Sequence, residues 1–277
     1  MNVSTIPSVQ LHNGVTMPQF GLGVWQARDG AEVESAVQTA LDAGYRLIDT
    51  AAIYGNETGV GHALRASDIP REELFITTKV WNSDQGYEQT LRAFDASLER
   101  LNCEYIDLYL IHWPMPAAGK FTETWRALEQ LYTDGKVRAI GVSNFKPSHL
   151  RELLTTAKIV PMVNQIELHP LLQQHQTREF CEAHNIHVES YSPLMQGGEL
   201  LNDPLIVQLA NSYDKSSAQI ILRWHIQHGF IVIPKSVTPN RIQENIDIFD
   251  FELSNDDMVT IDGLNQDKRI GADPDNF

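Results

Sequence analysis

The sequence predicts a closed (β/α)8 barrel with an N-terminal β-hairpin as a cap. Eight short apolar runs occur along the chain and an amphipathic segment follows each of them. The length of 277 residues is close to the ~250 residues typical of such barrels. No linker or low-complexity stretch divides the chain, so we expect a single domain spanning residues 1–277. The main alternative is an open doubly wound sheet, but Gly21 and Gly23 lack the third glycine of its phosphate-binding loop and open no helix.

The hairpin comes first. Residues 9–11 and 15–17 flank His12, Asn13 and Gly14, and an Asn-Gly pair supplies the positive φ angles of a tight hairpin turn. The strand candidates of the barrel follow, with Gly21 and Gly23 interpreted as a crowded first strand. They span residues 20–24, 46–49, 74–80, 106–111, 137–142, 162–166, 187–191 and 230–233.

The clearest helix candidate is residues 87–101. Its apolar residues recur at steps of four and three and form one face: Tyr87, Leu91, Phe94, Leu98 and Leu101. Similar faces occur at residues 33–41, before Gly44, and at residues 121–132, before Gly135. Thr238 followed by Pro239 predicts a helix N-cap with proline in the first turn.

Composition excludes several classes of protein. Lys and Arg number 21 against 36 Asp and Glu, a net charge of −15, which repels polyanions and anionic membranes and argues against a general nucleic-acid binder. Two cysteines, Cys103 and Cys181, are too few for a disulfide framework and are not spaced as a metal site, so we expect no bound metal. The chain shows neither a secretory signal nor an apolar stretch of about 18 residues, so we expect a cytoplasmic protein without a membrane partner. No feature predicts the oligomeric state.

Polar side chains end three neighbouring strands. Asp49 ends one strand, Lys79 lies near the end of the next, and His112 follows the third. The spacings, 79 − 49 = 30 and 112 − 79 = 33 residues, each equal one strand-helix unit. We therefore expect the three on adjacent strands at the same height, at the carboxyl-end mouth where barrel enzymes place catalysis.

Tyr54 lies in the loop that leaves the strand of Asp49. A lysine held by an aspartate stays protonated, and its charge lowers the pKa of a nearby phenol. A tyrosine acid, a lysine that tunes it, an aspartate that holds the lysine and a histidine that orients a substrate suit proton donation to a carbonyl oxygen, with hydride supplied from elsewhere. Taken singly, an Asp-Lys pair at a strand end is more often a scaffold ion pair, and a lone histidine there is more often a hydrogen-bonded rim residue; four such residues at one rim favour a functional site.

Three segments resemble a known family. Gly-Tyr-Arg-Leu-Ile-Asp-Thr-Ala at 44–51, with Tyr54, Glu57 and Gly61, is similar to the first signature of the aldo-keto reductases. Residues 136–145 and residues 233–236, the latter continuing to Arg241, are similar to two further family motifs. The resemblance implies an NADPH-dependent carbonyl reductase on a barrel without a Rossmann domain. It also implies a catalytic tetrad, with Tyr54 as general acid: Asp49, Tyr54, Lys79 and His112.

The resemblance also implies a cofactor site. Ser143, Asn144 and Gln165 would bind the nicotinamide carboxamide, and Tyr191 would stack on the ring, although Tyr191 is equally compatible with a core aromatic. The remaining implied contacts divide between the pyrophosphate (Ser192, Leu194), the adenosine 2′-phosphate (Lys235, Ser236, Arg241) and the adenine (Glu244, Asn245). Two cations and a hydroxyl at a helix N-terminus suit a dianion, which favours NADPH over NADH.

The substrate pocket is less defined. Trp25, Trp81 and Trp113 each follow a strand end. The resemblance implies that such residues form the pocket wall, together with Asn82, and packing aromatics are the alternative. The loop after His112 and the C-terminal tail are short, which predicts an open site for small aldehydes, ketones and dicarbonyls, as in the short bacterial and protist family members. A redox-sensing or structural subunit with negligible turnover is the main alternative. A hydrolase that uses Asp49 and His112 would leave Lys235 and Arg241 without a role.

Overall fold

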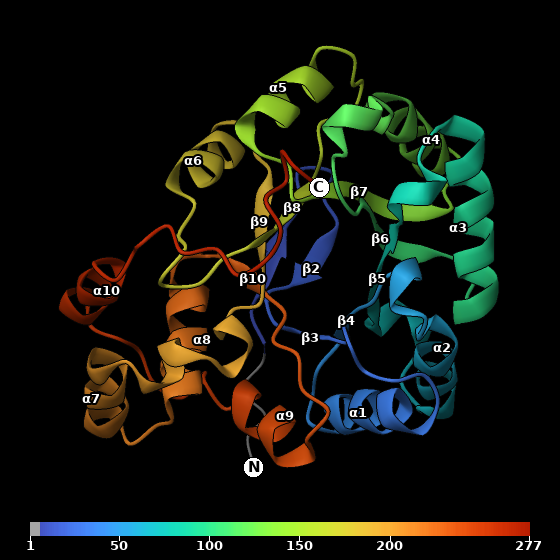
Figure 1. Ribbon diagram of the computed structural model, residues 1–277. Coiled ribbons are helices and arrows are strands. Elements are labelled where there is room, and N and C mark those ends of the chain that lie inside the picture. The colour runs from blue at the N-terminus through green and yellow to red at the C-terminus, as the bar shows by residue number, and fades with distance from the viewer. Residues whose placement is uncertain (1–5) are drawn as a thin grey trace.

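The computed structural model describes residues 6–277, and a barrel of parallel strands forms its centre (Figure 1). The strands pair in chain order from β3 to β10, and bridges from Phe20 to Val232 and from Gly23 to Lys235 bring the last strand back to the first. The predicted (β/α)8 barrel is therefore confirmed. The strands are β3 (Gly21–Gly23), β4 (Leu47–Asp49), β5 (Phe75–Val80), β6 (Ile106–Ile111), β7 (Val137–Ser143), β8 (Val163–Glu167), β9 (His187–Tyr191) and β10 (Ile231–Val232).

Helices surround the strands (Figure 1). The expected helices at 33–41, 87–101 and 121–132 are confirmed as α1, α3 and α4. Gly44 and Gly135 follow α1 and α4 with φ of 101° and 71°, a conformation that favours glycine. The helices are α1 (Ala31–Asp42), α2 (Glu57–Ala66), α3 (Tyr87–Leu101), α4 (Phe121–Thr133), α5 (Pro147–Leu154), α6 (His175–Ala183), α7 (Pro204–Tyr213), α8 (Ser217–Gln227), α9 (Pro239–Ile246) and α10 (Asn255–Asp262).

The start of α9 shows how the local sequence acts. Pro239 occupies the first turn of α9 as expected, but the Thr238 side chain forms no capping hydrogen bond. The Thr238 backbone N–H instead donates to the Ser236 hydroxyl at 3.1 Å.

No helix among residues 6–277 is both long and apolar enough to span a bilayer.

The predicted hairpin is confirmed as β1 (Ser8–Gln10) and β2 (Thr16–Pro18), which pair antiparallel. Its turn differs from the expectation, because Gly14 has a φ of 87° whereas Asn13 is not in the left-handed region. The Asn13 side chain instead accepts from Val15 N at 3.1 Å and donates to Arg138 O, at the start of β7, at 2.9 Å. The hairpin therefore covers the amino ends of the barrel strands.

The first strand is crowded, as expected. A Cβ on Gly21 would lie 2.4 Å from Leu47 Cγ, and one on Gly23 would lie 3.0 Å from Ile233 O. Real Cβ atoms do not approach as closely as the contact at Gly21, so the packing of β3 on β4 requires glycine there, and the contact at Gly23 is tighter than most real Cβ contacts. The apolar core fills the barrel interior below the mouth and the layer between the strands and the helices.

Candidate functional site

A cavity of about 1190 Å³ opens at the carboxyl ends of the barrel strands. Every predicted site residue except Lys79 lines it. Lys79 itself is fully buried and contacts the cavity residue Asp49 from below. The structure thus collects side chains from all parts of the chain at one mouth, as the barrel rule predicts.

The base of the cavity holds a buried ion pair. Lys79 Nζ donates to both carboxylate oxygens of Asp49, at 2.6 and 2.8 Å, and to the backbone oxygen of Thr50 at 2.9 Å. Burial lowers the pKa of Lys79, but Asp49 outweighs that effect and the net direction is upward. Lys79 is therefore a cation with all three N–H groups occupied.

The expectation that these residues stand at the same height is wrong. Asp49 on β4 pairs with Thr77 on β5, so Lys79 lies two residues farther along its strand. Barrel strands are tilted and staggered, and the long lysine side chain reaches back to the aspartate. Chain spacing identified neighbouring strands but could not give their register.

Tyr54 lies above this ion pair, with its hydroxyl 3.5 Å from Lys79 Nζ. Its loop is held by Asn56, which donates to Val24 O at 2.9 Å and to Ala27 O at 3.0 Å. Burial raises the pKa of Tyr54, and the charge of Lys79 only partly offsets it. The expectation of a lowered phenol pKa is therefore wrong for the protein alone, because desolvation exceeds the field of the lysine.

His112 follows β6 and completes the group. Its ring centroid lies 5.7 Å from that of Tyr54 and 5.1 Å from that of Trp81. Burial and the nearby Lys79 charge hold the pKa of His112 well below 6.5. The imidazole is therefore neutral at physiological pH and carries one N–H donor.

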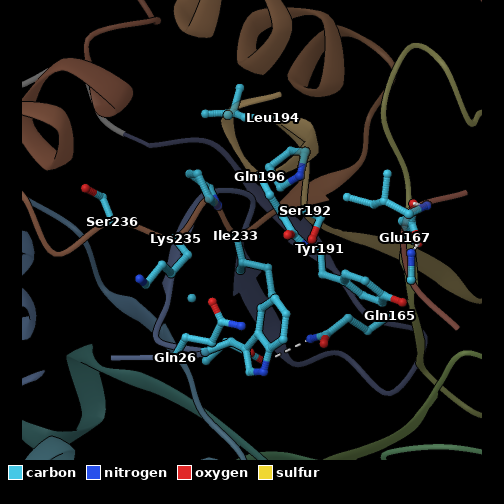
Figure 2. Close-up of a pocket in the computed structure, with 18 of the residues that line it drawn as sticks. Gln26, Gln165, Glu167, Tyr191, Ser192, Leu194, Gln196, Ile233, Lys235 and Ser236 are labelled. Atoms are coloured by element: carbon cyan, nitrogen blue, oxygen red, sulfur yellow. Dashed lines mark hydrogen bonds between the residues drawn. The ribbon is translucent and has the colours of Figure 1, made fainter. Parts of the chain in front are cut away.

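A wall of amides continues the cavity beside this group. Asn144 donates to His112 O at 3.0 Å and to Ser143 Oγ at 3.1 Å, and accepts from the Tyr191 hydroxyl at 2.8 Å. Gln165 donates to Asp49 at 2.8 Å. Figure 2 shows Gln165 and Tyr191 together on one side of the pocket.

The other end of the cavity is cationic. Lys235 and Arg241 line it and form no ion pair with residues 6–277. In Figure 2, Lys235 and Ser236 lie on the opposite side of the pocket from Gln165. Ser192, Leu194, Glu244 and Asn245 complete the predicted cofactor residues in the lining. Two unpaired cations in a strongly acidic chain favour an anionic ligand here.

The cavity lining concentrates unusual backbone geometry. Four of its non-glycine residues have left-handed φ angles: Gln26 (61°), Asn144 (65°), Ser192 (49°) and Gln196 (54°). This conformation is uncommon for non-glycine residues and collects at ligand sites, where the surrounding structure enforces it. At Asn144, three side-chain hydrogen bonds provide that enforcement.

The tail after α10 passes over the barrel, and the C-terminus lies near its centre (Figure 1). Glu167, buried at the end of β8, accepts from Ile270 N at 2.7 Å and Gly271 N at 2.8 Å. Phe277 packs on Trp113 with ring centroids 4.2 Å apart. The short tail thus reaches the mouth, contrary to the open site expected, and no local pattern in the sequence signalled this contact.

Sequence reasoning also missed Glu189. It is fully buried in β9, and a signal existed, since an acidic residue interrupts the apolar strand at 187–191. Glu167 carries the same signal at the end of β8.

The three predicted tryptophans, Trp25, Trp81 and Trp113, all line the cavity, and Trp25 is 42 % exposed.

Residues 19–266 match the model of the Aldo/keto reductase family. The chain belongs to the aldo/keto reductase family. It is 59% identical over 97% of its length to a 9,11-endoperoxide prostaglandin H2 reductase of Trypanosoma cruzi, covering 95% of that protein. It is 58% identical over its whole length to a glyoxal reductase of Bacillus subtilis, covering 99% of that protein. A mutant of Gox0644, crystallised in complex with NADPH, is 48% identical with a TM-score of 0.92, and 98% of each chain is covered.

Proposed function

We propose that the protein reduces small aldehydes, ketones and dicarbonyls to alcohols with NADPH, and that Tyr54 is the general acid. The glyoxal reductase of Bacillus subtilis supports the substrate class, and the NADPH complex of Gox0644 supports the cofactor. The observation that carries the proposal is the Tyr54 hydroxyl, which faces the cavity 3.5 Å from a buried lysine cation.

The residues present fit a phosphorylated dinucleotide. One end of the cavity presents side-chain amides and the other presents two unpaired cations. In this proposal Ser143, Asn144 and Gln165 hold the carboxamide and Tyr191 flanks the ring. Ser192 and Leu194 lie along the pyrophosphate, and the far end is divided between the 2′-phosphate (Lys235, Ser236, Arg241) and the adenine (Glu244, Asn245). When bound, the reduced nicotinamide supplies a hydride for the carbonyl carbon.

Side chains of the protein donate the proton and stabilise the charge that its transfer leaves. The raised pKa of Tyr54 keeps the phenol protonated at neutral pH, so its O–H is available to the oxygen of a carbonyl in the cavity. As the proton leaves, the Lys79 ammonium stabilises the phenolate, and Asp49 keeps that ammonium in place. The neutral His112 donates an N–H toward the same oxygen, and the tryptophans Trp25, Trp81 and Trp113 form the apolar walls.

The test follows the absorbance of reduced nicotinamide with purified protein. We expect oxidation of NADPH in the presence of glyoxal or methylglyoxal, and a much lower rate with NADH. Tight binding of NADPH with no turnover on any aldehyde, ketone or dicarbonyl would favour the redox-sensing subunit. Absence of dinucleotide binding would refute the proposal altogether.

A further inference from the structure

Glu189 is a buried acid that has no role in the proposed carbonyl reduction. It lies in the middle of β9, paired in register with Gln165 on the neighbouring strand β8. The Glu189 side chain is fully buried, and its Oε2 atom accepts a hydrogen bond from Gln165 Nε2 at 3.0 Å. The contact joins a buried carboxyl to a side chain that lines the cavity.

The Gln165 amide nitrogen has only two hydrogens. One bonds to Asp49 Oδ2 at 2.8 Å and the other to Glu189 Oε2 at 3.0 Å. Turning the amide over would place its oxygen against the Asp49 carboxylate and lose the hydrogen bond to that anion. The geometry therefore fixes the amide with its nitrogen toward the barrel interior, leaving Oε1 without a partner among residues 6–277.

The neighbouring amide is oriented in the same sense. Both N–H groups of Asn144 are taken, by His112 O and Ser143 Oγ, and its Oδ1 faces the Tyr191 hydroxyl. This stretch of wall thus offers side-chain amide oxygens rather than amide hydrogens. Such a wall suits a ligand group that donates, and the amino group of a carboxamide is one.

We infer that Glu189 is a positioning residue: together with Asp49 it clamps the Gln165 amide, so that only the amide oxygen faces the cavity and accepts from the amino group of the nicotinamide carboxamide. The inference rests on the proposed function, because it assumes a nicotinamide in this cavity. It adds a residue that touches neither cofactor nor substrate.

Asp49 alone does not provide this clamp. Both of its oxygens are already engaged by Lys79, and a single hydrogen bond leaves the Gln165 amide free to pivot about it. A second acceptor on the adjacent strand fixes the amide plane. Burial and the charge of Asp49 raise the pKa of Glu189 to about 8, so at neutral pH the clamp adds no second buried anion, and a neutral carboxyl still accepts through an oxygen.

The test compares two dinucleotides that differ only at the inferred contact. In the 3-acetylpyridine analogue of NADP⁺ a methyl group replaces the carboxamide amino group and removes the donor. Dissociation constants for both are measured at pH 6.5 by quenching of tryptophan fluorescence. The variants are Glu189→Met, which cannot accept, and Glu189→Gln, which matches the neutral acid in shape and can. Glu129→Gln is the control, because Glu129 is also buried but accepts from Lys158 N and Ile159 N, away from the cavity.

We expect the wild type to bind NADP⁺ about five- to tenfold more tightly than the analogue, the effect of one hydrogen bond. Glu189→Gln and Glu129→Gln should keep this preference, whereas Glu189→Met should reduce it to about twofold or less. General damage to the fold would weaken the binding of both dinucleotides alike and leave the ratio of their dissociation constants unchanged.

Three results would overturn the inference: no preference in the wild type, an undiminished preference in Glu189→Met, or a lost preference in Glu189→Gln. Should Glu189→Met not fold, Gln165→Met serves instead, since retention of the full preference without the amide would also overturn it. Failure of the wild type to bind either dinucleotide would refute the proposed function, which keeps the two claims separable.

Discussion

Replacing Tyr54 with Phe removes one hydroxyl and tests the centre of the proposed chemistry. The structure indicates that the fold tolerates this loss. Lys79 has three N–H groups, and Asp49 Oδ1, Asp49 Oδ2 and Thr50 O accept them at 2.6, 2.8 and 2.9 Å without Tyr54. The tyrosine contact is longer, at 3.5 Å, so no buried charge is left without a partner. We expect the free energy of unfolding to change by less than about 1 kcal/mol.

The effect on turnover should be much larger. A positioned general acid contributes about 10²–10⁴-fold to a rate, equivalent to about 3–5 kcal/mol of transition-state stabilisation. Because Phe keeps the ring, the affinity for NADPH should stay within about twofold of the wild type. Initial rates with saturating NADPH and methylglyoxal give kcat, and fluorescence titration gives the dissociation constant of the cofactor.

Tyr132→Phe is the matched control. The Tyr132 hydroxyl accepts from Asn13 in the hairpin, away from the cavity, so its loss should leave kcat unchanged. A Tyr54→Phe enzyme with kcat within about threefold of the wild type and normal NADPH affinity would refute Tyr54 as the acid. A comparable fall in Tyr132→Phe would show that the assay reports stability rather than chemistry.

Three further predictions address other parts of the molecule. Arg241→Ala removes an unpaired cation from the cavity. It should weaken the affinity for NADPH about tenfold or more and change the affinity for NADH by less than about twofold. Equal losses of affinity in titrations with both dinucleotides would exclude a 2′-phosphate contact. Because the pKa of His112 lies well below 6.5, the ring stays neutral from about pH 6 to about 8 and protonates only at lower pH, so a kcat profile with an inflection near 6.5 would contradict its assigned state. Gly21→Ala would bring a Cβ 2.4 Å from Leu47 Cγ and should lower the free energy of unfolding in urea by about 1–3 kcal/mol; unchanged stability would show that β3 shifts readily.

Much of the fold was predictable because it depends on local periodicity. Apolar steps of three and four determine which face of α3 is buried, and Gly44 and Gly135 mark helix ends because the chain there needs a positive φ. The hairpin turn was predicted only in part, since both Asn13 and Gly14 suit such a turn but only Gly14 adopts the left-handed conformation. The extent of the domain beyond residues 19–266, like the role of each site residue, stays a prediction.

The sequence predicted which residues form the candidate site, but not their protonation states or their contacts with one another. The spacing of Asp49, Lys79 and His112 placed them on adjacent strands, because a strand-helix unit has a nearly constant length. The family motifs around them added the expected cofactor residues. The protonation state of each group does not follow from such motifs. The direction of the pKa shift of Tyr54 was predicted wrongly, because desolvation depends on every neighbouring atom.

The barrel, the order of its strands and the types of side chain at its mouth could be predicted from the chain, since they follow from apolar periodicity and the regular spacing of strand-helix units. Three features came only from the three-dimensional arrangement: the stagger of Lys79 against Asp49, the clamp of Glu189 on Gln165 and the contact of Phe277 with Trp113. Each of these joins separate elements of the chain. Such contacts depend on strand register, burial and packing in three dimensions, which no local pattern encodes.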